Sequence, residues 1–461
     1  MPAQTMNEKP CSLPLNSVGL SADSRVLIVG LGKTGLSAAR FLAHHRIRFA
    51  VVDSRESPPG LDELREANPH AAVFLGGFNE AAFAAATHLV VSPGVPLEIP
   101  PVVAAVARGV RVFGDVDLFA CSAQAPVVAI TGSNGKSTVT TLVGLMADLD
   151  GRRVQVGGNL GVPMLDLLDS EAELYVLELS SFQLERASLL EPVVATVLNV
   201  TPDHMDRYPD IESYARAKAR IFFGRGMMVL NRDEPAVAAM ASRDRRCLWF
   251  GLDSDPALDF GVATVGGQEW LAQRGEPLLR VADLRIRGRH NVSNALAALA
   301  LGTAANLSRP AIIRALREFT GLDHRMQWVA EIRGVSYIND SKATNVGACL
   351  AALSGLTEKT VLIAGGDGKG ADFSVLVSVA ARKLRAAVLM GRDAPLLEKV
   401  LRGVVPLVRV ENMREAVAAG QRLAQPGDTV LLAPACASFD QYADYQERGR
   451  VFVDAVRGLS S

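Results

Sequence analysis

The sequence contains two glycine-rich segments of the kind that binds phosphate groups. The first, residues 30–35 (Gly-Leu-Gly-Lys-Thr-Gly), lies between the β-branched run Val26–Val29 and the helical stretch Leu36–Ala43. A turn without side chains lets backbone N–H groups at a helix start approach a phosphate closely. Asp53 ends the next predicted strand, Phe49–Val52, where an acidic group commonly contacts a ribose hydroxyl. The segment predicts a nucleotide site, with a ligand-free tight turn as the structural alternative.

The second segment, residues 127–138, reads as a strand, a glycine loop and the start of a helix. Backbone amides of such a loop surround phosphates, Lys136 would neutralise the terminal ones, and the Ser137 hydroxyl would bind Mg²⁺. Position 130 is Ile, so the segment departs from the common G-x-x-x-x-G-K-[ST] pattern. Every group needed to hold ATP is nevertheless present, which predicts an ATP site separate from the first nucleotide site.

Polar side chains at the ends of neighbouring predicted strands supply candidate metal ligands. Glu178 ends the strand Tyr175–Leu177, and Asn199 ends the following strand. Open α/β sheets bind ligands at these ends, and Mg²⁺ prefers hard oxygen ligands such as carboxylates. His204 and Lys218 come next along the chain; taken alone, they would be a structural loop histidine and a solvated helix lysine.

Three further polar clusters follow strands in the last third of the chain. They are residues 339–345 (Asn-Asp-Ser-Lys-Ala-Thr-Asn), 365–369 (Gly-Gly-Asp-Gly-Lys) and 434–438 (Pro-Ala-Cys-Ala-Ser). Strand-end clusters of one sheet should converge on one crevice. Residues 289–294 precede an apolar helix, where capping is the structural alternative for both asparagines, and residues 322–325 mark a linker that carries an arginine.

The elements that position these residues follow an α/β pattern. Strand and helix signals alternate almost throughout, which predicts largely parallel sheets. Between about Leu258 and Ile286, short runs separated by Gly and Pro predict a small antiparallel patch. The alternation pauses near Gly114 and Gly321, so we expect a Rossmann-like first domain, a central P-loop ATPase-type domain and a Rossmann-like third domain. Their predicted ranges are residues 1–114, with a loose extension over 1–24, residues 115–321 and residues 322–461.

The composition of the 461 residues excludes several classes of protein. Lys plus Arg number 48 against 49 for Asp plus Glu, which argues against a dedicated nucleic-acid binder. The five cysteines are scattered without a C-x-x-C pair, so neither a disulfide framework nor a cysteine-ligated zinc is expected, and a reducing cytoplasm fits. The polar N-terminus lacks the apolar core of an export signal, and no apolar run approaches the roughly 20 residues of a membrane helix.

These motifs, in this order, resemble those of the Mur ligases, the ATP-dependent amide ligases that build the peptidoglycan stem peptide. The resemblance extends from about Arg25 to the C-terminus. The matching segments are residues 131–138, 178–183, 199–206, 290–294, 323–325, 339–345 and 365–369. Within the family, residues 340–345, 365–369 and 436–441 most resemble the branch that adds D-glutamate.

The resemblance implies roles for individual residues. The ATP-binding residues would be Gly132, Ser133, Asn134, Gly135, Lys136, Ser137, Thr138, Asn291, Asn294, Arg325 and Asp340. The UDP-substrate site would comprise Gly32, Thr34, Asp53, Ser54, Arg55, Gly94 and Asn159, and the D-glutamate site Thr344, Lys369, Ser438, Phe439 and Tyr445. The metal ligands would be Ser137, Glu178, His204 and a carbamylated Lys218, and the catalytic residues Lys136, His204, Lys218 and Lys342.

The implied activity is the addition of D-glutamate to UDP-N-acetylmuramoyl-L-alanine through an acyl phosphate, with ATP and two Mg²⁺ ions. The resemblance implies a cytoplasmic monomer that acts on small molecules and needs neither nucleic acid nor membrane. Two features depart from the family pattern. The extension before Ser24 has no counterpart, and Tyr442 and Tyr445 stand where the pattern usually has Phe.

Three alternatives stay open on the sequence. Another amide ligase of the superfamily, such as a different Mur ligase or a folylpolyglutamate synthetase, would differ in its substrates. A nicotinamide dehydrogenase would use residues 30–35 and Asp53, but it leaves the second phosphate loop unexplained. A nucleotide-gated binding protein would not need the polar clusters of the third domain.

Overall fold

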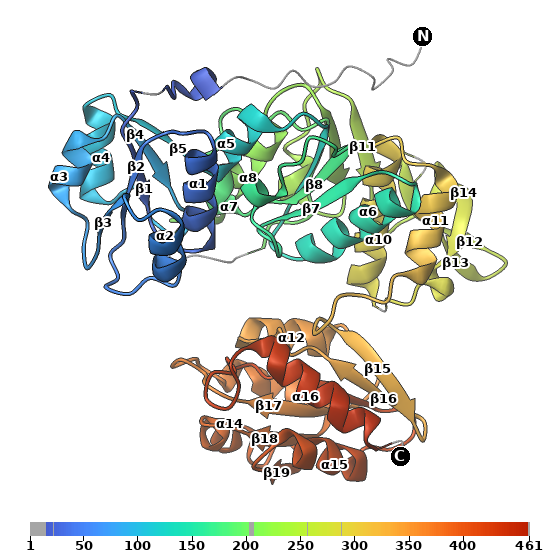
Figure 1. Ribbon diagram of the computed structural model, residues 1–461. Coiled ribbons are helices and arrows are strands. Elements are labelled where there is room, and N and C mark those ends of the chain that lie inside the picture. Colours follow the sequence, from blue (N-terminus) through green and yellow to red (C-terminus); the bar gives the residue numbers. More distant parts are fainter. Residues whose placement is uncertain (1–14, 22, 202–206, 256, 287, 460–461) are drawn as a thin grey trace. The chain divides into compact units, whose positions relative to one another are not determined.

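A computed structural model describes residues 15–21, 23–201, 207–255, 257–286 and 288–459 (Figure 1). The chain forms two compact units, residues 1–284 with 292–317 and residues 285–291 with 318–461. The first unit contains two β-sheets and the second unit contains one. Within the described ranges, no helix is both long enough and apolar enough to cross a membrane.

The first sheet is built from five strands, all parallel. Its elements are η1 (Leu15–Val18), β1 (Val26–Val29), α1 (Lys33–His44), β2 (Phe49–Val52), α2 (Leu61–Ala67), β3 (Ala72–Phe74), α3 (Glu80–Ala85), β4 (His88–Val91), α4 (Pro100–Ala107) and β5 (Arg111–Phe113). The strand order is β3-β2-β1-β4-β5, so the winding reverses between β1 and β4. Helices α1 and α2 cover one face, and α3 and α4 cover the other. Ligands of such a sheet are expected at the carboxyl ends of β1 and β4.

The second sheet has nine strands in the order β14-β13-β12-β11-β10-β9-β6-β8-β7. Its strands are β6 (Val127–Thr131), β7 (Val154–Gly158), β8 (Leu174–Glu178), β9 (Val194–Val197), β10 (Met227–Asn231), β11 (Cys247–Phe250), β12 (Phe260–Val265), β13 (Gln268–Gln273) and β14 (Glu276–Arg280). Its helices are α5 (Asp115–Ser122), α6 (Lys136–Leu149), η2 (Met164–Leu167), α7 (Ser181–Leu184), α8 (Ile211–Ala219), η3 (Arg220–Phe222), α9 (Pro235–Ala238), η4 (Val281–Asp283), α10 (Arg289–Ala304) and α11 (Arg309–Glu318). In this order, all neighbouring strands from β12 to β7, including β6, pair in parallel. The pairs β12–β13 and β13–β14 are antiparallel. The order reverses at β6, which pairs with β8 and with β9.

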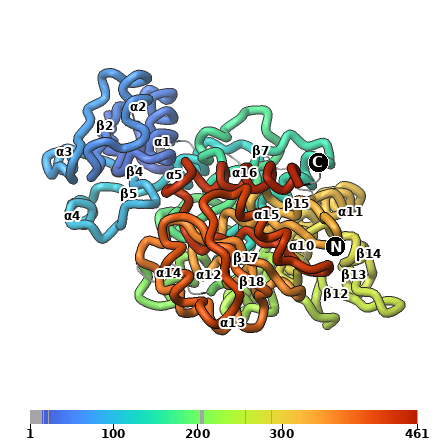
Figure 2. The backbone as a smooth tube through the Cα atoms, turned by 90° about the horizontal axis from the view of Figure 1, so that it is seen from below, coloured from blue at the N-terminus to red at the C-terminus, as the bar shows by residue number. Residues whose placement is uncertain are grey.

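The third sheet has the strand order β15-β16-β20-β17-β18-β19 and is parallel except for the β15–β16 pair. Its strands are β15 (Gln327–Ile332), β16 (Val335–Asn339), β17 (Thr360–Gly365), β18 (Leu384–Met390), β19 (Leu407–Arg409) and β20 (Thr429–Leu432). Its helices are α12 (Val346–Ser354), η5 (Ser374–Leu376), α13 (Val377–Lys383), α14 (Ala394–Leu401), α15 (Met413–Leu423) and α16 (Tyr445–Arg457). Figure 2 shows α15 and α16 side by side; they cover one face, and α12, α13 and α14 cover the other.

One hydrophobic core serves both sheets of the first unit. Val116, Leu118 and Phe119 of α5 are completely buried, and their cluster includes Ile28 of β1 as well as Tyr175 of β8. The rings of Phe119 and Tyr175 meet edge to face with their centroids 5.0 Å apart. Full burial of each large apolar side chain contributes roughly 2 kcal/mol, so α5 joins the two sheets by apolar packing.

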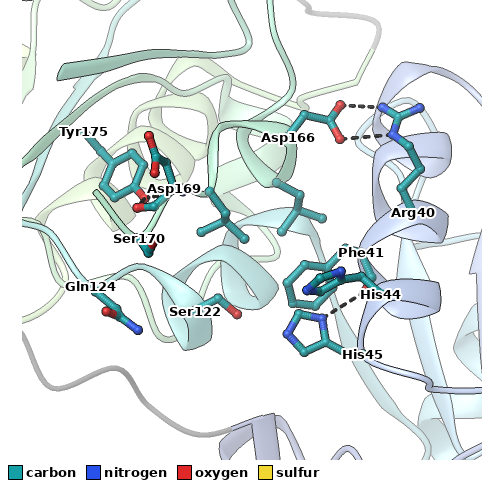
Figure 3. A pocket seen from close by; sticks show the side chains of 12 residues that line it. Arg40, Phe41, His44, His45, Ser122, Gln124, Asp166, Asp169, Ser170 and Tyr175 are labelled. Carbon is teal, nitrogen blue, oxygen red and sulfur yellow. Dashed lines mark hydrogen bonds and ion pairs between the residues drawn. The ribbon is translucent and has the colours of Figure 1, made fainter. Parts of the chain in front are cut away.

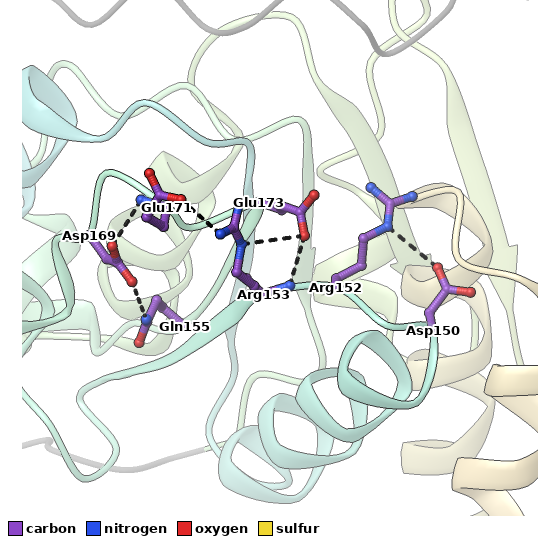
Figure 4. Close-up of polar contacts among 7 residues, drawn as sticks. All are labelled: Asp150, Arg152, Arg153, Gln155, Asp169, Glu171 and Glu173. Atoms are coloured by element: carbon purple, nitrogen blue, oxygen red, sulfur yellow. Dashed lines mark hydrogen bonds and ion pairs between the residues drawn. The ribbon is translucent and has the colours of Figure 1, made fainter.

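Polar contacts hold the loop between η2 and β8 on the edge strand β7 (Figure 4). Arg153 pairs with Glu171 at 2.8 Å, and the backbone N–H of Arg153 donates to Glu173 at 2.9 Å. The Gln155 amide donates to Asp169 at 3.0 Å. These groups are exposed to solvent, so each pair contributes at most about 1 kcal/mol, and we assign them a structural role only.

The predicted α/β class, with a largely parallel central sheet and a small antiparallel patch, is confirmed. Two details are corrected. Residues 15–21 are not loose, because Leu15–Val18 form η1 and the side chains of Val18 and Leu20 are buried in the shared core. The strand signal of the third domain, which the sequence places first at Val335–Ile338, begins earlier, because the edge strand β15 precedes it; the polar residues Gln327 and Glu331 interrupt the apolar signal of β15.

Gly35 provides a test of how α1 packs on β1. A Cβ atom at Gly35 would lie 2.0 Å from the carbonyl oxygen of Gly30, whereas one at Gly32 would meet nothing within 4 Å. We expect Gly35→Ala to destabilise the first unit by about 2 kcal/mol or more and Gly32→Ala, at the N-cap of α1, to destabilise it by no more than about 1 kcal/mol. Urea unfolding of both variants measures the difference, and equal midpoints would contradict this packing.

Candidate active site

The phosphate loop lies at the reversal point of the second sheet, between β6 and α6. Gly135 has a φ of 82° and immediately precedes α6, a conformation that favours glycine. A Cβ atom there would lie 2.3 Å from Oδ1 of Asn294 in α10. The structure therefore brings together two residues predicted to bind ATP, and Thr138 follows them in the first turn of α6.

Hydrogen bonds fix the phosphate loop to the end of β9. The Asn134 N–H donates to Oδ1 of Asn199 at 2.8 Å, and the Ser133 N–H donates to the Asn199 carbonyl at 3.0 Å. The Ser133 hydroxyl donates to the Thr201 carbonyl at 3.0 Å. Asn199, which the sequence marked only as a strand end, thus holds the loop in place.

Lys136 and Lys218 meet at one carbonyl group. The Nζ atom of Lys136 donates to the carbonyls of Gly132 and Ser133 at 2.8 and 3.0 Å, and Nζ of Lys218 donates to the same Gly132 carbonyl at 2.9 Å. Lys218 is 1% exposed, and its Nζ lies 4.3 Å from the ring centroid of Tyr214. The solvated helix lysine that the isolated sequence favoured at this position is therefore wrong.

Glu178, at the end of β8, joins the phosphate loop to the loop after β7. Its carboxylate accepts from the Ser137 hydroxyl at 2.7 Å and from the Asn159 amide at 2.7 Å, and its carbonyl accepts from the Asn159 N–H at 2.8 Å. The residue is 3% exposed, and a buried carboxylate requires such donors. Two predicted metal ligands and a predicted UDP-substrate contact are thus joined in one hydrogen-bonded chain.

The oxygen atoms of the Ser137 hydroxyl and the Glu178 carboxylate suit Mg²⁺, because this ion prefers hard oxygen ligands. The predicted ligand His204 lies outside the described residues. Among the residues that are described, no three His, Cys, Asp or Glu side chains gather in a group that would hold a metal. Ser137 and Glu178 are the two predicted metal ligands that the described residues bring within hydrogen-bond distance of each other.

The glycine turn after β1 and the loop after β4 lie together at the reversal point of the first sheet. The Ser92 hydroxyl donates to the Gly30 carbonyl at 2.8 Å, and a Cβ atom on Gly30 would lie 3.0 Å from Cγ2 of Val95. These two segments carry the predicted UDP-substrate residues Gly32, Thr34 and Gly94.

Asp53 supports the glycine turn from the end of β2. Its carboxylate accepts from the Leu31 N–H at 2.7 Å and from the Arg55 N–H at 2.9 Å, and it pairs with the Arg55 guanidinium at 2.8 and 2.7 Å. Burial raises the pKa of Asp53, but the hydrogen bonds from Arg55 and Leu31 outweigh this and lower it to about 2. Asp53 is buried and positions the turn, whereas Ser54 and Arg55 beside it are exposed.

The three polar clusters of the third sheet lie together. Asp367 and Ala437 exchange two backbone hydrogen bonds at 3.0 and 2.8 Å, and the Ala435 N–H donates to the Ala343 carbonyl at 3.0 Å. Ser438, a predicted D-glutamate contact, follows directly and is 2% exposed. The expected convergence of these strand ends is confirmed.

The predicted amino-acid residues of the third sheet form two cation–aromatic pairs. The Nζ atom of Lys342 lies 4.2 Å from the ring centroid of Tyr445, and Nζ of Lys369 lies 5.7 Å from that of Phe439. The Thr344 N–H donates to the Lys342 carbonyl at 2.8 Å, which places Thr344 in the same turn. Lys369 and Phe439 are exposed, so this pair is open to a ligand.

Arg448 of α16 connects two of these clusters, and no sequence motif indicated it. Its Nε and Nη2 donate to the Ser341 hydroxyl and carbonyl at 3.0 and 2.9 Å, and both Nη atoms donate to the Cys436 carbonyl at 3.2 and 3.1 Å. Burial lowers the pKa of Arg448 to about 10. Only its place on the buried face of an amphipathic helix distinguishes it from other helical arginines.

Asp340 is 9% exposed and lies beside the predicted nucleotide contact Arg325. Its Oδ1 accepts from the Met326 N–H at 3.2 Å. Burial raises the pKa of Asp340 to about 6, and the Met326 hydrogen bond and the Arg325 charge oppose this rise. Asn291, also predicted to bind ATP, lies in the first turn of α10 and is 9% exposed.

A cavity of about 370 Å³ in the first unit lies away from all of these strand ends (Figure 3). His44 and His45 at the end of α1 line it, together with Asp166 of η2, and Arg40 forms an ion pair with Asp166 beside it. Because α1 begins at the glycine turn, its end lies at the opposite edge of the first sheet. The candidate active site is therefore not in this cavity.

Comparison with known proteins decides which family these sites belong to. The MurD-like N-terminal domain of Mur ligases matches residues 24–114, the Mur ligase middle domain matches 130–302, and the Mur ligase glutamate ligase domain matches 324–436. The chain belongs to the Mur ligase family. A UDP-N-acetylmuramoylalanine–D-glutamate ligase of Methylococcus capsulatus is 64% identical over 443 residues, which cover 96% of each chain. A ligase of the same name from Pseudomonas aeruginosa is 53% identical over 96% of this chain and 99% of its own.

Solved structures agree with a Mur ligase fold. The UDP-N-acetylmuramate–alanine ligase of Thermotoga maritima matches 95% of this chain and 100% of its own, with a TM-score of 0.58 and 17% identity. The FolC protein of E. coli, in complex with DHPP and ADP, matches 74% of this chain and 91% of its own, with a TM-score of 0.54 and 16% identity. At these identities the likeness establishes the fold alone.

Asp340 gives this Mur ligase a pH-dependent stability that can be tested. Because the pKa of Asp340 is raised to about 6 from 3.8, the folded protein binds this proton more tightly, and stability is lost as the pH rises from about 4 to about 6. We expect Asp340→Asn to stabilise the second unit by about 2–3 kcal/mol at pH 7.5 and to have little effect near pH 4. Thermal unfolding at both pH values measures this. A variant that is less stable than wild type at pH 7.5 would contradict it.

Proposed function

We propose that this Mur ligase joins D-glutamate to the L-alanyl carboxylate of UDP-N-acetylmuramoyl-L-alanine and converts ATP to ADP and phosphate. The observation that carries the proposal is the chain Ser137–Glu178–Asn159, which joins the hydroxyl of an ATP loop to a predicted contact of the UDP substrate. Relatives at 53% and 64% identity over almost the whole chain bear the name of this reaction. The nucleotide substrates and the unpaired thiols of the four described cysteines support a cytoplasmic enzyme, which we expect to act as a monomer.

The chemistry requires activation of the carboxylate. An oxygen of the L-alanyl carboxylate attacks the γ-phosphorus of ATP, the bond to the β,γ-bridging oxygen breaks, and an acyl phosphate and ADP form. The amine of D-glutamate then attacks the acyl carbon, loses a proton to water, and the tetrahedral intermediate expels phosphate. The N-terminus of α6, which begins at Lys136 directly after Gly135, would offer its backbone N–H groups to the terminal phosphates, and Lys136 would neutralise their negative charge.

Bound Mg²⁺ would stabilise the charge that develops on the transferring phosphoryl group. In our proposal Ser137 and Glu178 hold one ion, and His204 and Lys218 complete the ligand set for two. Ser137 already lies within hydrogen-bond distance of Glu178, which orients its hydroxyl at the phosphate loop.

The second unit provides the amino-acid site in this proposal. Lys369 and Ser438 offer a cation and a hydroxyl to the side-chain carboxylate of D-glutamate, and Phe439 and Tyr445 form the aromatic walls. Lys342, which lies against Tyr445, would neutralise the transferred phosphate. A neutral glutamine side chain would lose a charge-assisted hydrogen bond, typically about 1.5–3 kcal/mol.

We expect phosphate release from ATP to require both UDP-N-acetylmuramoyl-L-alanine and D-glutamate. Turnover with D-glutamine should fall at least about tenfold, because the side-chain carboxylate is absent. A coupled phosphate assay over a panel of amino acids and acceptors measures both requirements. Turnover with a different amino acid, or with a folate acceptor, would instead identify another amide ligase of the superfamily, and an NADH-dependent signal would identify a dehydrogenase.

We further propose that Lys218 is a carbamate in the active enzyme. Two ammonium groups otherwise donate to the same Gly132 carbonyl at 2.8 and 2.9 Å, and because Lys218 is buried, their mutual repulsion is stronger than it would be in water. Carbon dioxide adds to the neutral amine of Lys218, and loss of a proton leaves a carboxylate. This product removes one positive charge and supplies the hard oxygen that Mg²⁺ prefers.

Lys218→Ala and Lys218→Arg test the carbamate. We expect both variants to lose most activity, Arg because a guanidinium does not form the carbamate, and we expect acetate or formate to restore part of the activity of Lys218→Ala. Activity in the phosphate assay and native mass spectrometry at neutral pH measure this, because a carbamate decomposes in acid. An active Lys218→Arg enzyme would exclude the carbamate while leaving the ligase assignment intact.

A further inference from the structure

Arg186 is a buried cation that links α7, next to the second sheet, to the loop after β4 of the first sheet. It follows α7, its side chain is 0% exposed, and its Nη2 donates to the carbonyl of Val95 in the loop after β4. Its Nη1 donates to the Phe182 carbonyl and lies 3.4 Å from Oε2 of Glu185. Within the described part of the chain, its Nε has no hydrogen-bond partner. Removing a guanidinium from water costs free energy of folding, so a buried arginine such as Arg186 is expected to have a functional role.

The Val95 end of this contact belongs to the predicted UDP-substrate site. The Val95 N–H donates to the Ser92 carbonyl at 3.0 Å, and the Ser92 hydroxyl holds the Gly30 carbonyl at 2.8 Å. Gly94 lies within this short loop and is exposed. Arg186 therefore anchors a loop that forms one wall of the glycine turn.

Arg186 lies at the end of the segment of residues 178–186, which begins at Glu178 and contains α7. Directly after Glu178, Ser180 and Gln183 form a capping box, with hydrogen bonds of 3.2 and 3.1 Å. The Gln183 amide also donates to Asp115 of α5 at 2.9 Å. Only eight positions separate Glu178 from Arg186, and these contacts hold the intervening turn rigidly.

Gly114 and Asp115, at the start of α5, lie beside the buried side chain of Arg186. Gly114 leaves room for the side chain, because a Cβ atom there would lie 3.2 Å from Cβ of Arg186 and 3.5 Å from its Cδ. Asp115 is buried next to it; burial raises the pKa of Asp115, and the positive charge of Arg186 opposes that rise. The cation thus has a defined pocket at the junction of α5 and α7.

We propose that Arg186 is a positioning residue that holds the loop of residues 92–95 at a fixed distance from Glu178. This inference rests on the proposed function, in which one substrate extends from the glycine turn to the phosphate loop. Its diphosphate is bound at one sheet while its carboxylate reacts at the other. A fixed spacing between the loop and Glu178 lowers the ordering cost of binding this substrate, whereas ATP contacts the second sheet and does not depend on that spacing.

Arg186→Met tests the proposal, because it keeps the buried apolar stem and removes the donors. We expect the KM for UDP-N-acetylmuramoyl-L-alanine to rise about tenfold or more, with the KM for ATP within about twofold of wild type. Arg186→Gln, which retains one amide donor, should be intermediate and serves if Arg186→Met folds poorly. An unchanged KM for the UDP substrate in a folded Arg186→Met enzyme would overturn the proposal.

Two arginines serve as matched controls. Arg40 also joins the two sheets, through Asp166, but at the edge away from the site. Arg220 donates to the Leu184 and Ala187 carbonyls at 2.8 and 2.6 Å, on the same segment as Arg186, but does not reach the loop after β4. We expect Arg40→Met and Arg220→Met to lower thermal stability without changing the ratio of the two KM values. The same KM change in either control would show that Arg186 acts through general stability.

Hydrogen exchange separates this proposal from the proposed function. Peptides covering the loop after β4 should exchange faster in Arg186→Met than in wild type, and those covering residues 132–138 should not. If phosphate release by the wild-type protein does not depend on the UDP substrate, the proposed function is wrong. The hydrogen-exchange result alone then decides whether Arg186 positions the loop. Equal exchange of the loop in the variant and in wild type would overturn the positioning role.

Discussion

A carboxylate removed from water must be paired with hydrogen-bond donors, and the second sheet is arranged around this requirement at Glu178. Its donors come from Ser137, after β6, and from Asn159, after β7, so three adjacent strands are fixed in register at their carboxyl ends. The phosphate loop gains a second attachment through Asn199 of the next strand. Since four strand ends converge there, the loop is preorganised before any ligand arrives, which is what phosphoryl transfer requires of a protein.

Apolar packing and buried charge hold the first two sheets together in different ways. The completely buried side chains of α5, such as Phe119, supply the bulk of the stabilisation without fixing fine distances. Arg186 instead makes directional hydrogen bonds to the Phe182 carbonyl of α7 and to the Val95 carbonyl in the loop after β4, and it is the better candidate for setting a distance. The partly exposed Arg40 pair with Asp166 at the far edge contributes little by comparison.

The second unit shows the stability cost of a functional site. Asp340 is buried with its pKa raised, and it weakens the folded state at neutral pH. Arg448 is buried with its pKa lowered, but it has four hydrogen bonds to two strand-end clusters and so holds them together. Arg448 therefore has a structural reason for its burial, whereas the burial of Asp340 lowers stability at neutral pH and fits its predicted role as a nucleotide contact.

The sequence by itself determined the α/β class, the two phosphate-binding turns and the strand ends that carry polar residues. These features depend on local signals, because glycine, β-branched runs and helix starts act over a few neighbouring residues. Tertiary structure alone decided that Lys218 is buried against Gly132, that Asp53 holds the glycine turn, and that Arg186 and Arg448 are buried. An arginine residue gives no local sequence signal of the partners that it will have when buried, because only the segments that meet it in the fold determine its hydrogen bonds and its charge environment.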